Sequence, residues 1–385
     1  MMKLAFQIAY KNLMGAGLRT WLNVAVLSFA FVIIIFFNGL MDGWNRQSRT
    51  DSIAWEYGHG HLQNDAYDPY DAFTLQDGHA EIPSKVKNVT PILVQQGNIY
   101  PEGRMMSVLL KGIDKEQGTI KIPTEAFTTS TAQFPAIIGN RMAEAAQLKV
   151  GDQVLLRWRD KNGTFDASNI TIVDIFDTTV ASVDSGQIWL PIETLWEMTG
   201  LHNHATLAIA NSNYEHVPIE GWNFESQAEM LQNLDDIISM KKYSSSILYI
   251  LLLAIALLAI FDTQVLSIFR RQKEIGTYIA LGMTRLQVVR LFTVEGSMYS
   301  FLAMIVGCIY GIPLFIFLNA KGIGMPQASQ EMGISLADRI YPIFGLQLIV
   351  GTILLVTISA TIVSYLPARK IAKMNPVLAL KGKLQ

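Results

Sequence analysis

Charged residues and cysteine are both scarce in this sequence. Only 16% of the 385 residues are Asp, Glu, Lys or Arg, whereas a soluble domain usually carries about 25%. This deficit indicates a membrane protein with a soluble part. The net charge of −2 excludes a strongly basic nucleic-acid-binding protein. The single cysteine, Cys308, lies in an apolar run and excludes an internal disulfide.

Catalytic and nucleotide-binding motifs are also missing from the sequence. It contains no G-x-x-x-x-G-K-[ST], no G-x-S-x-G and no H-E-x-x-H. The tightest histidine pairs, His59/His61 and His202/His204, are two residues apart and share a face only in a strand. We interpret them as surface or structural histidines rather than metal ligands. The sequence therefore predicts a non-catalytic chain that holds no metal and no cofactor.

Four long apolar runs are present, at residues 20–41, 243–269, 291–318 and 343–366. Each reaches the roughly 20 residues that a helix needs to cross about 30 Å of hydrocarbon. The first run is longer than the apolar region of a signal peptide, and no small-x-small cleavage site follows before Asp42. We expect it to be a retained anchor and the chain to cross the membrane four times.

Lysine and arginine near the span ends predict the orientation. They cluster before the first span, at 270–290 between the second and third spans, and after the fourth span at 367–385. The loop 319–342 holds only Lys321 and Arg339. Because positively charged loops stay in the cytoplasm, we expect both termini and residues 270–290 to be cytoplasmic. Residues 42–242 and the short loop 319–342 then lie on the other side.

Residues 42–242 have the pattern of a folded, mixed α+β extracytoplasmic domain. Short β-like runs alternate with turn signals, as in "ILVQQGNIY", "SVLLKGID", "DQVLLRW", "NITIVDIF" and "GQIWLP". Residues 141–146 read as a short helix that a Gly-Asp turn delivers into a strand at 153–158. The apolar stripe in 230–238 predicts a helix that runs directly into the second span.

The first 19 residues predict an amphipathic helix on the inner membrane surface. Leu4, Ala5, Ile8, Ala9 and Leu13 recur at helical spacing, opposite polar residues. A frayed cytoplasmic tail is the alternative.

Two acidic residues lie within or beside the apolar runs. Asp262 lies eight residues before Arg270, about 12 Å along a helix. An ionised Asp at mid-bilayer costs roughly 2.5–3.5 kcal/mol, so a proton or substrate relay and an interhelical hydrogen bond are both open, and we favour the hydrogen bond. Glu295 lies five residues past Arg290 and reaches the interface, so we favour an interfacial acid there.

The cytoplasmic loop "RRQKEIGTYIALGMTRLQVVRLFTVEG" is more elaborate than a simple connection. Residues 273–281 predict a two-turn helix with Ile275, Tyr278 and Ile279 on one face. Gly282 suits the position that follows a helix C-terminus. Thr284 and Gln287 have the spacing of a capping box that starts the next helix. The pattern predicts a docking helix whose groove belongs to another chain.

This loop resembles the R-x-x-E-I-G-x-x-x-A-L-G-x-[ST] signature of MacB/FtsX-like ABC-transporter permeases. The matching positions are Arg270, Glu274, Ile275, Gly276, Ala280, Leu281, Gly282 and Thr284. "LPARKIAKMNPVLALKG" is similar to the ending P-A-x-x-A-x-x-x-x-P-x-x-A-L of the family, with Ala372 one place late. "AYKNLMGAGLRTWLNV" and "IIGNRMAEAAQLKVGDQV" resemble its first segment and its extracytoplasmic domain.

The resemblance implies an inner-membrane permease that pairs with a second copy or a paralogue. A separate cytoplasmic ABC ATPase dimer would bind ATP and Mg²⁺, and residues 274–282 would couple the permease to it. The layout is closest to the lipoprotein-releasing LolC/LolE type, which implies mechanotransmission that releases a lipoprotein, lipid or peptide, with or without a periplasmic carrier. The alternatives are export of peptides or small amphiphiles with a periplasmic adaptor, and FtsX-like regulation of a cell-wall hydrolase.

Overall fold

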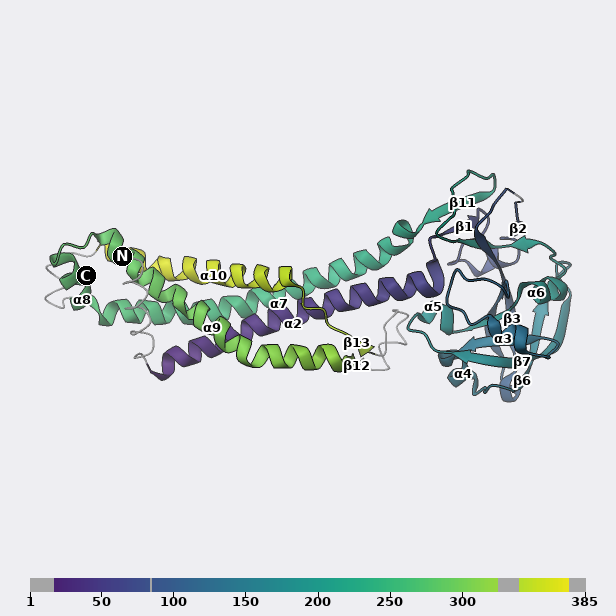
Figure 1. Ribbon diagram of the computed structural model, residues 1–385, viewed down its shortest axis with the longest axis horizontal. Coiled ribbons are helices and arrows are strands. Elements are labelled where there is room, and N and C mark those ends of the chain that lie inside the picture. Colours follow the sequence, from purple (N-terminus) through teal and green to yellow (C-terminus); the bar gives the residue numbers. More distant parts are fainter. Residues whose placement is uncertain (1–16, 84, 325–338, 374–385) are drawn as a thin grey trace. The chain divides into compact units, whose positions relative to one another are not determined.

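The computed structural model describes residues 17–83, 85–324 and 339–373, and elements carry the labels of Figure 1. The described chain divides into two compact units. The first, called here the helical unit, comprises the chain up to residue 43 together with 238–323 and the chain from 341. The second, the sheet unit, comprises 44–237 and 324–340. The predicted amphipathic helix at 1–19 and the tail beyond 373 lie almost wholly outside the described residues.

Four long helices run alongside one another in the helical unit (Figure 1). They are α2 (Leu18–Ser52), α7 (Gln227–Arg270), α9 (Arg285–Lys321) and α10 (Leu346–Ala368). Each is long and apolar enough to cross a membrane. Helix α7 is continuous from the stripe at 230–238 into the apolar run, as the sequence predicts. A nine-residue helix, α8 (Gln272–Ala280), follows α7, and a 3₁₀ turn (Arg369–Lys373) follows α10.

Close packing and interhelical polar contacts hold these helices together. The shared core contains Leu27, Ala256, Ala303 and Ala360, all essentially inaccessible. Asn23 Nδ2 of α2 donates to Thr263 Oγ1 of α7 at 2.6 Å. In a lipid bilayer, an apolar side chain gains little by contacting protein instead of lipid tails. Small residues and interhelical hydrogen bonds such as this one therefore stabilise helix association.

Glycine permits the closest approach between α9 and α10. A Cβ added at Gly296 would lie 2.2 Å from Ser364 Oγ and 2.3 Å from Ser364 Cβ. Gly351 of α10, in contrast, has open space where a Cβ would be. The backbone of α9 at Gly296 therefore packs directly on the Ser364 side chain of α10. Any other residue at position 296 would displace one of these groups.

The sheet unit is built on a nine-stranded sheet of order β11-β1-β10-β3-β4-β8-β5-β7-β6. Strand β3 also pairs with β6, with Gly97 opposite Trp158, so that six strands from β3 to β6 form a closed ring. The pairs β4–β8 and β5–β7 are parallel and the others are antiparallel. The strands are β1 (Gly60–Asn64), β3 (Val89–Ile99), β4 (Met106–Ile113), β5 (Pro135–Gly139), β6 (Gln153–Arg159), β7 (Phe165–Phe176), β8 (Gln187–Pro191), β10 (Leu207–Ala210) and β11 (Trp222–Ser226).

Short elements connect and cover this sheet. Strands β2 (Ala80–Glu81) and β9 (His204–Ala205) pair with each other, while β12 (Ile323–Gly324) and β13 (Arg339–Ile340) lie between α9 and α10 in the chain. The helices are α3 (Glu125–Thr129), α4 (Asn140–Ala146), α5 (Ala181–Asp184) and α6 (Ile192–Thr199), with a π-helical turn (Ile53–Tyr57) and 3₁₀ turns at Ala72–Leu75 and Pro101–Gly103.

The ring encloses an apolar core to which alternate strand residues contribute. Leu93, Leu110, Ile138, Leu156 and Ile188 are fully buried there. Because successive side chains of a strand point to opposite faces, the alternation in "DQVLLRW" places one set inside. A second core lies on the other face of the sheet, around Trp189.

A buried ion pair fixes the start of α4. Asp184, 1% exposed, accepts from the Arg141 backbone N–H at 3.0 Å and from Arg141 Nη1 at 2.7 Å. A Cβ at Gly139 would lie 1.7 Å from Asp184 Oδ1, so only glycine fits there. Burial raises the pKa of Asp184, while the Arg141 charge and hydrogen bonds oppose that shift.

The five strands and the short helix that the sequence predicts are present as β3, β4, β6, β7, β8 and α4. Strands β1, β5, β10 and β11 were not predicted. The mixed α+β domain is confirmed, although α2 extends to Ser52 and α7 begins at Gln227, both inside the range 42–242.

Candidate functional site

Helix α8 ends in a glycine turn with a complete set of backbone hydrogen bonds. The Met283 N–H donates to Tyr278 O at 3.0 Å, and the Gly282 N–H donates to Ile279 O at 3.1 Å. Gly282 has φ +100°, a conformation that side chains disfavour. This pattern is a Schellman motif, which satisfies the last carbonyl groups of the helix.

The next helix starts two residues later with the predicted capping box. Gln287 N–H donates to Thr284 Oγ1 at 3.3 Å, and Thr284 N–H donates to Gln287 Oε1 at 2.8 Å. Both capping features at this corner are therefore confirmed, and together they fix the chain direction between α8 and α9.

The apolar face of α8 packs against its own chain, which corrects the prediction that it faces a partner. Ile275 is 0% exposed, and Tyr278 and Ile279 are partly buried against the same cluster. The cluster consists of Ile268, Ile275, Val288, Val289, Phe292, Ala368 and Ile371. Gly276 is also buried, so it does not offer a close approach to another protein. A helix this short is unstable alone, and it is stabilised here by burying its apolar stripe in the corner formed by α7, α9 and α10.

The opposite face of α8 is open. Lys273, Thr277, Ala280 and Leu281 are exposed, with Leu281 at 79%. Their spacing of four, three and one residues places them on one side of the helix. Four of the predicted coupling residues, Glu274, Ala280, Leu281 and Gly282, are exposed. We name Lys273, Thr277, Ala280 and Leu281 the outer face of α8.

Arg271 joins α8 to α9. Its Nη1 lies 2.9 Å from both carboxylate oxygens of Glu295, and its Nε donates to Glu274 Oε2 at 2.7 Å. The guanidinium also lies 4.8 Å from the ring centroid of Phe292. Burial by itself lowers the pKa of Arg271, but Glu295 and Glu274 raise it on balance, so the arginine is a permanent cation.

The two acidic partners of Arg271 differ in exposure. Glu274 is half-exposed and pairs with Arg271 three residues away. Glu295, which the sequence suggests is an interfacial acid, is 7% exposed and its carboxylate is bound by Arg271. The sequence signal available was the spacing of three residues between Arg271 and Glu274; the link to Glu295 spans 24 residues and had no local signal.

Asp262 also differs from the favoured interpretation. It is exposed on α7, and within the described chain no hydrogen bond or ion pair of its carboxylate is present. The interhelical hydrogen bond at this level is made by the adjacent Thr263, which accepts from Asn23. The helix turns Thr263 toward α2 and Asp262 away from the bundle.

One segment in the C-terminal part of the chain matches a family model. Residues 246–376 match the model described as "FtsX-like permease C-terminal". This segment contains most of α7, all of α8, α9 and α10, and the whole corner described above.

Individual relatives agree with this match. An uncharacterized ABC transporter permease of Methanocaldococcus jannaschii is 30% identical over 131 residues, which cover 34% of this chain and 30% of the relative. The macrolide export protein MacB of Escherichia coli is 27% identical over 161 residues, 40% of this chain and 23% of MacB. The lipoprotein-releasing transmembrane protein LolC of Neisseria meningitidis is 21% identical over 327 residues, 77% of this chain and 76% of LolC.

The first curated relatives are matched over only 23% to 30% of their own length. Among solved structures, the extracellular domain of the transporter YknZ covers 40% of this chain and 83% of that domain, at 13% identity and a TM-score of 0.23, too low to establish a shared fold. The match at 246–376, together with the relatives, shows that this chain carries an FtsX-like permease domain and is similar to ABC transporter permeases such as MacB and LolC.

Proposed function

We propose that this chain is the membrane subunit of an ABC transporter and that the outer face of α8 is its contact with a cytoplasmic ATPase. The observation that carries the proposal is the rigid attachment of α8. Its inner face is buried, its C-terminus has a Schellman motif, and Arg271 holds it to Glu295. A helix attached in this way transfers a push on its outer face to α7 and α9 without bending.

The transmission path would be α7. This helix runs without interruption for 44 residues, about 66 Å at 1.5 Å per residue. Within the helical unit the Lys242–Asp42 ion pair joins α7 to α2, and within the sheet unit Arg49–Asp235 joins the same two helices. ATP and Mg²⁺ would be bound by the ATPase dimer, and its closure would move α8 and, through α7, the extracytoplasmic domain.

We further propose that the transporter releases lipoproteins from the membrane, and that a second copy of this permease or a paralogue completes its membrane part. The support is the match to LolC, which extends over 76% of that relative. Relatives named for macrolide and pyoverdine export are matched over shorter stretches, whereas one named for syringafactin export is matched over 412 residues, 98% of this chain and 58% of that relative. Export of a small amphiphile is therefore the alternative substrate class.

The proposed topology places the sheet unit outside the cytoplasm and both termini inside. Asn162 lies exposed in the turn between β6 and β7. In a Cys308→Ser background, an Asn162→Cys variant should react with a membrane-impermeant maleimide in intact cells whose outer membrane has been permeabilised. Reaction only after lysis of the cytoplasmic membrane would contradict this orientation.

The contact with the ATPase is tested by a charge on the outer face. Leu281→Asp changes a side chain that is 79% exposed, so the permease itself should fold normally. In a dry interface the unpaired carboxylate would cost about 3 kcal/mol or more, equivalent to roughly 150-fold weaker binding of the ATPase. Ile279→Asp would be a poorer test, because Ile279 packs on its own chain and the charge would disturb the fold.

The matched control is Leu18→Asp at the start of α2, where the leucine is 77% exposed. Each variant is purified with its ATPase, and the affinity of the two proteins is measured in nanodiscs. We expect the Leu281 variant to lose the ATPase and the Leu18 variant to retain it. Equal retention by both variants would show that α8 is only a connection.

A further inference from the structure

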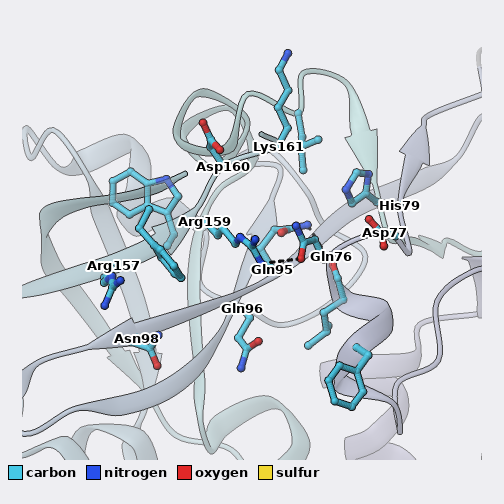
Figure 2. A pocket seen from close by; sticks show the side chains of 15 residues that line it. Gln76, Asp77, His79, Gln95, Gln96, Asn98, Arg157, Arg159, Asp160 and Lys161 are labelled. Atoms are coloured by element: carbon cyan, nitrogen blue, oxygen red, sulfur yellow. Dashed lines mark hydrogen bonds between the residues drawn. The ribbon is translucent and has the colours of Figure 1, made fainter. Parts of the chain in front are cut away.

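A polar cavity of about 420 Å³ lies in the sheet unit, far along the chain from the coupling helix. Strand β3 contributes Gln95, Gln96 and Asn98, and β6 contributes Arg157 and Arg159. Figure 2 shows these side chains, with the segment at 76–79 and Lys161 of the β6–β7 turn around the same opening. The cavity has the size typical of small-molecule sites, roughly 300–1,000 Å³.

Two arginines of this cavity are held in place by groups that carry no negative charge. The Arg157 guanidinium lies 4.0 Å from the ring centroid of Phe165, and no carboxylate of the described chain forms an ion pair with it. Arg159 donates from Nε to Gly163 O at 3.0 Å and from Nη1 to Gln76 Oε1 at 3.1 Å, the bond drawn in Figure 2. Both guanidinium groups are therefore positioned by neutral partners, which leaves their positive charge uncompensated.

The acidic residues of the cavity offset only part of this charge. Asp160 accepts from the backbone N–H groups of Thr164 at 2.7 Å and Asn162 at 2.9 Å, and the Thr164 hydrogen bond in particular lowers its pKa. Its carboxylate is thus held in the β6–β7 turn, beside Lys161. The three cations Arg157, Arg159 and Lys161 therefore outnumber the two acids of the lining, Asp77 and Asp160.

The remaining lining is neutral and suited to hydroxyl groups. Gln96 and Asn98 present side-chain amides that can donate and accept. Gln95 is 7% exposed and its Nε2 donates to Leu75 O, while Gln76 Oε1 accepts from Arg159. Two aromatic rings are exposed at the same cavity: Phe165 at 56% and Phe73 at 90%. Exposed rings offer flat apolar surfaces to a ligand that has both apolar C–H faces and polar edges.

We propose that this cavity binds a carboxylate-bearing saccharide. The carboxylate would be bound by the Arg157 fork, the hydroxyl groups by the amides of β3, and a sugar face by Phe165 or Phe73. A bare inorganic anion would make no contacts with the amides and rings, and an apolar ligand would cover three cations without binding any of them. This site is independent of the proposed coupling to an ATPase, because its ligand binds the purified chain without nucleotide.

The test is isothermal titration of the purified full-length chain with three probes. Digalacturonic acid carries the carboxylates, its dimethyl ester has the same rings without charge, and inorganic phosphate is an anion without a sugar. We expect digalacturonic acid to bind about tenfold or more tightly than either of the other two. Arg157→Ala should weaken it by about tenfold or more, since a hydrogen bond to a charged group is lost. Arg104→Ala, an exposed arginine outside the cavity, should change nothing.

Three results would overturn the proposal. Equal binding of the ester would show a neutral sugar site, and full competition by phosphate would show a simple anion site. No heat up to about 10 mM digalacturonic acid, weaker than any useful affinity, would show that the cavity does not take this chemistry. Arg157 is only half-buried, so its variant should remain folded, and an unchanged melting temperature confirms that a loss of binding is local.

Discussion

Removal of Arg271 should loosen the corner where α8 meets α9. Arg271 is 16% exposed and Glu295 9% exposed at the side-chain level, with both carboxylate oxygens 2.9 Å from the same nitrogen. Arg271→Met keeps the length of the side chain but removes the cation that binds the buried carboxylate of Glu295. Such a loss costs about 3–5 kcal/mol, much more than the pair with the half-exposed Glu274, which contributes about 0.5 kcal/mol or less.

A double variant separates the charge from the packing. Arg271→Met combined with Glu295→Met replaces the ion pair by two apolar side chains, and such replacements are often neutral or stabilising. The double variant should therefore recover most of the stability that Arg271→Met loses. Glu274→Gln is the control for the exposed pair and should have almost no effect.

Hydrogen exchange of the backbone amides measures this local stability directly. A loss of about 3 kcal/mol in the free energy of local opening corresponds to roughly 150-fold faster exchange. We expect this acceleration in the amides of α8 and the first turn of α9 in the single variant, and near-normal exchange in the double variant. Acceleration below about threefold in Arg271→Met would refute the view that Arg271 clamps the corner.

Three further predictions concern packing, pH and the bundle. Gly296→Ala should destabilise the helical unit by about 1–3 kcal/mol through overpacking. Gly351→Ala should have no such effect, because its new methyl group meets open space. Thermal unfolding of both variants in detergent measures the difference. Burial lowers the pKa of His61 in the folded protein. As the pH falls, His61 is therefore protonated in the unfolded chain before it is protonated in the folded chain. Calorimetry should therefore show the sheet unit losing about 1.4 kcal/mol per pH unit as pH falls below 6.5, until the folded-state pKa is reached, and His61→Gln should weaken this dependence. Thr263→Val should cost about 0.5–1.5 kcal/mol because it loses an interhelical hydrogen bond, while Asp262→Leu should not destabilise the bundle, as heating in detergent will show.

Local chemistry made the corner between α8 and α9 predictable. A glycine followed by Thr284 and Gln287 encodes a helix end and a helix start within six residues, and the structure has both. The same reasoning located five strands from β-prone runs and turn signals: β6 shows clear alternation, whereas β8 is buried throughout and was located by its flanking glycine and proline. Strands β5 and β10, which are also short and buried almost throughout, show no alternation and were missed.

The wrong expectations all concern which way a side chain points. The stripe of Ile275, Tyr278 and Ile279 was visible in the sequence, but whether it packs on its own chain or on a partner depends on residues up to about a hundred positions away, including Ile371. The pairing of Arg271 with Glu295 and the outward direction of Asp262 are likewise set by how α7, α9 and α2 meet. No spacing within one segment contains that information.

The correction to α8 strengthens its proposed role rather than removing it. A coupling element that used its apolar stripe to bind a partner would be poorly held whenever the partner moved, because a nine-residue helix is unstable by itself. Here the apolar stripe fixes the helix to its own chain, and the side with Thr277 and Ala280, whose side chains are small, is exposed. If the proposed ATPase binds there, the small side chains would let it approach the helix closely. A displacement of α8 would then be passed to α7 through contacts that are already formed, which is the arrangement that the proposed transmission of force requires.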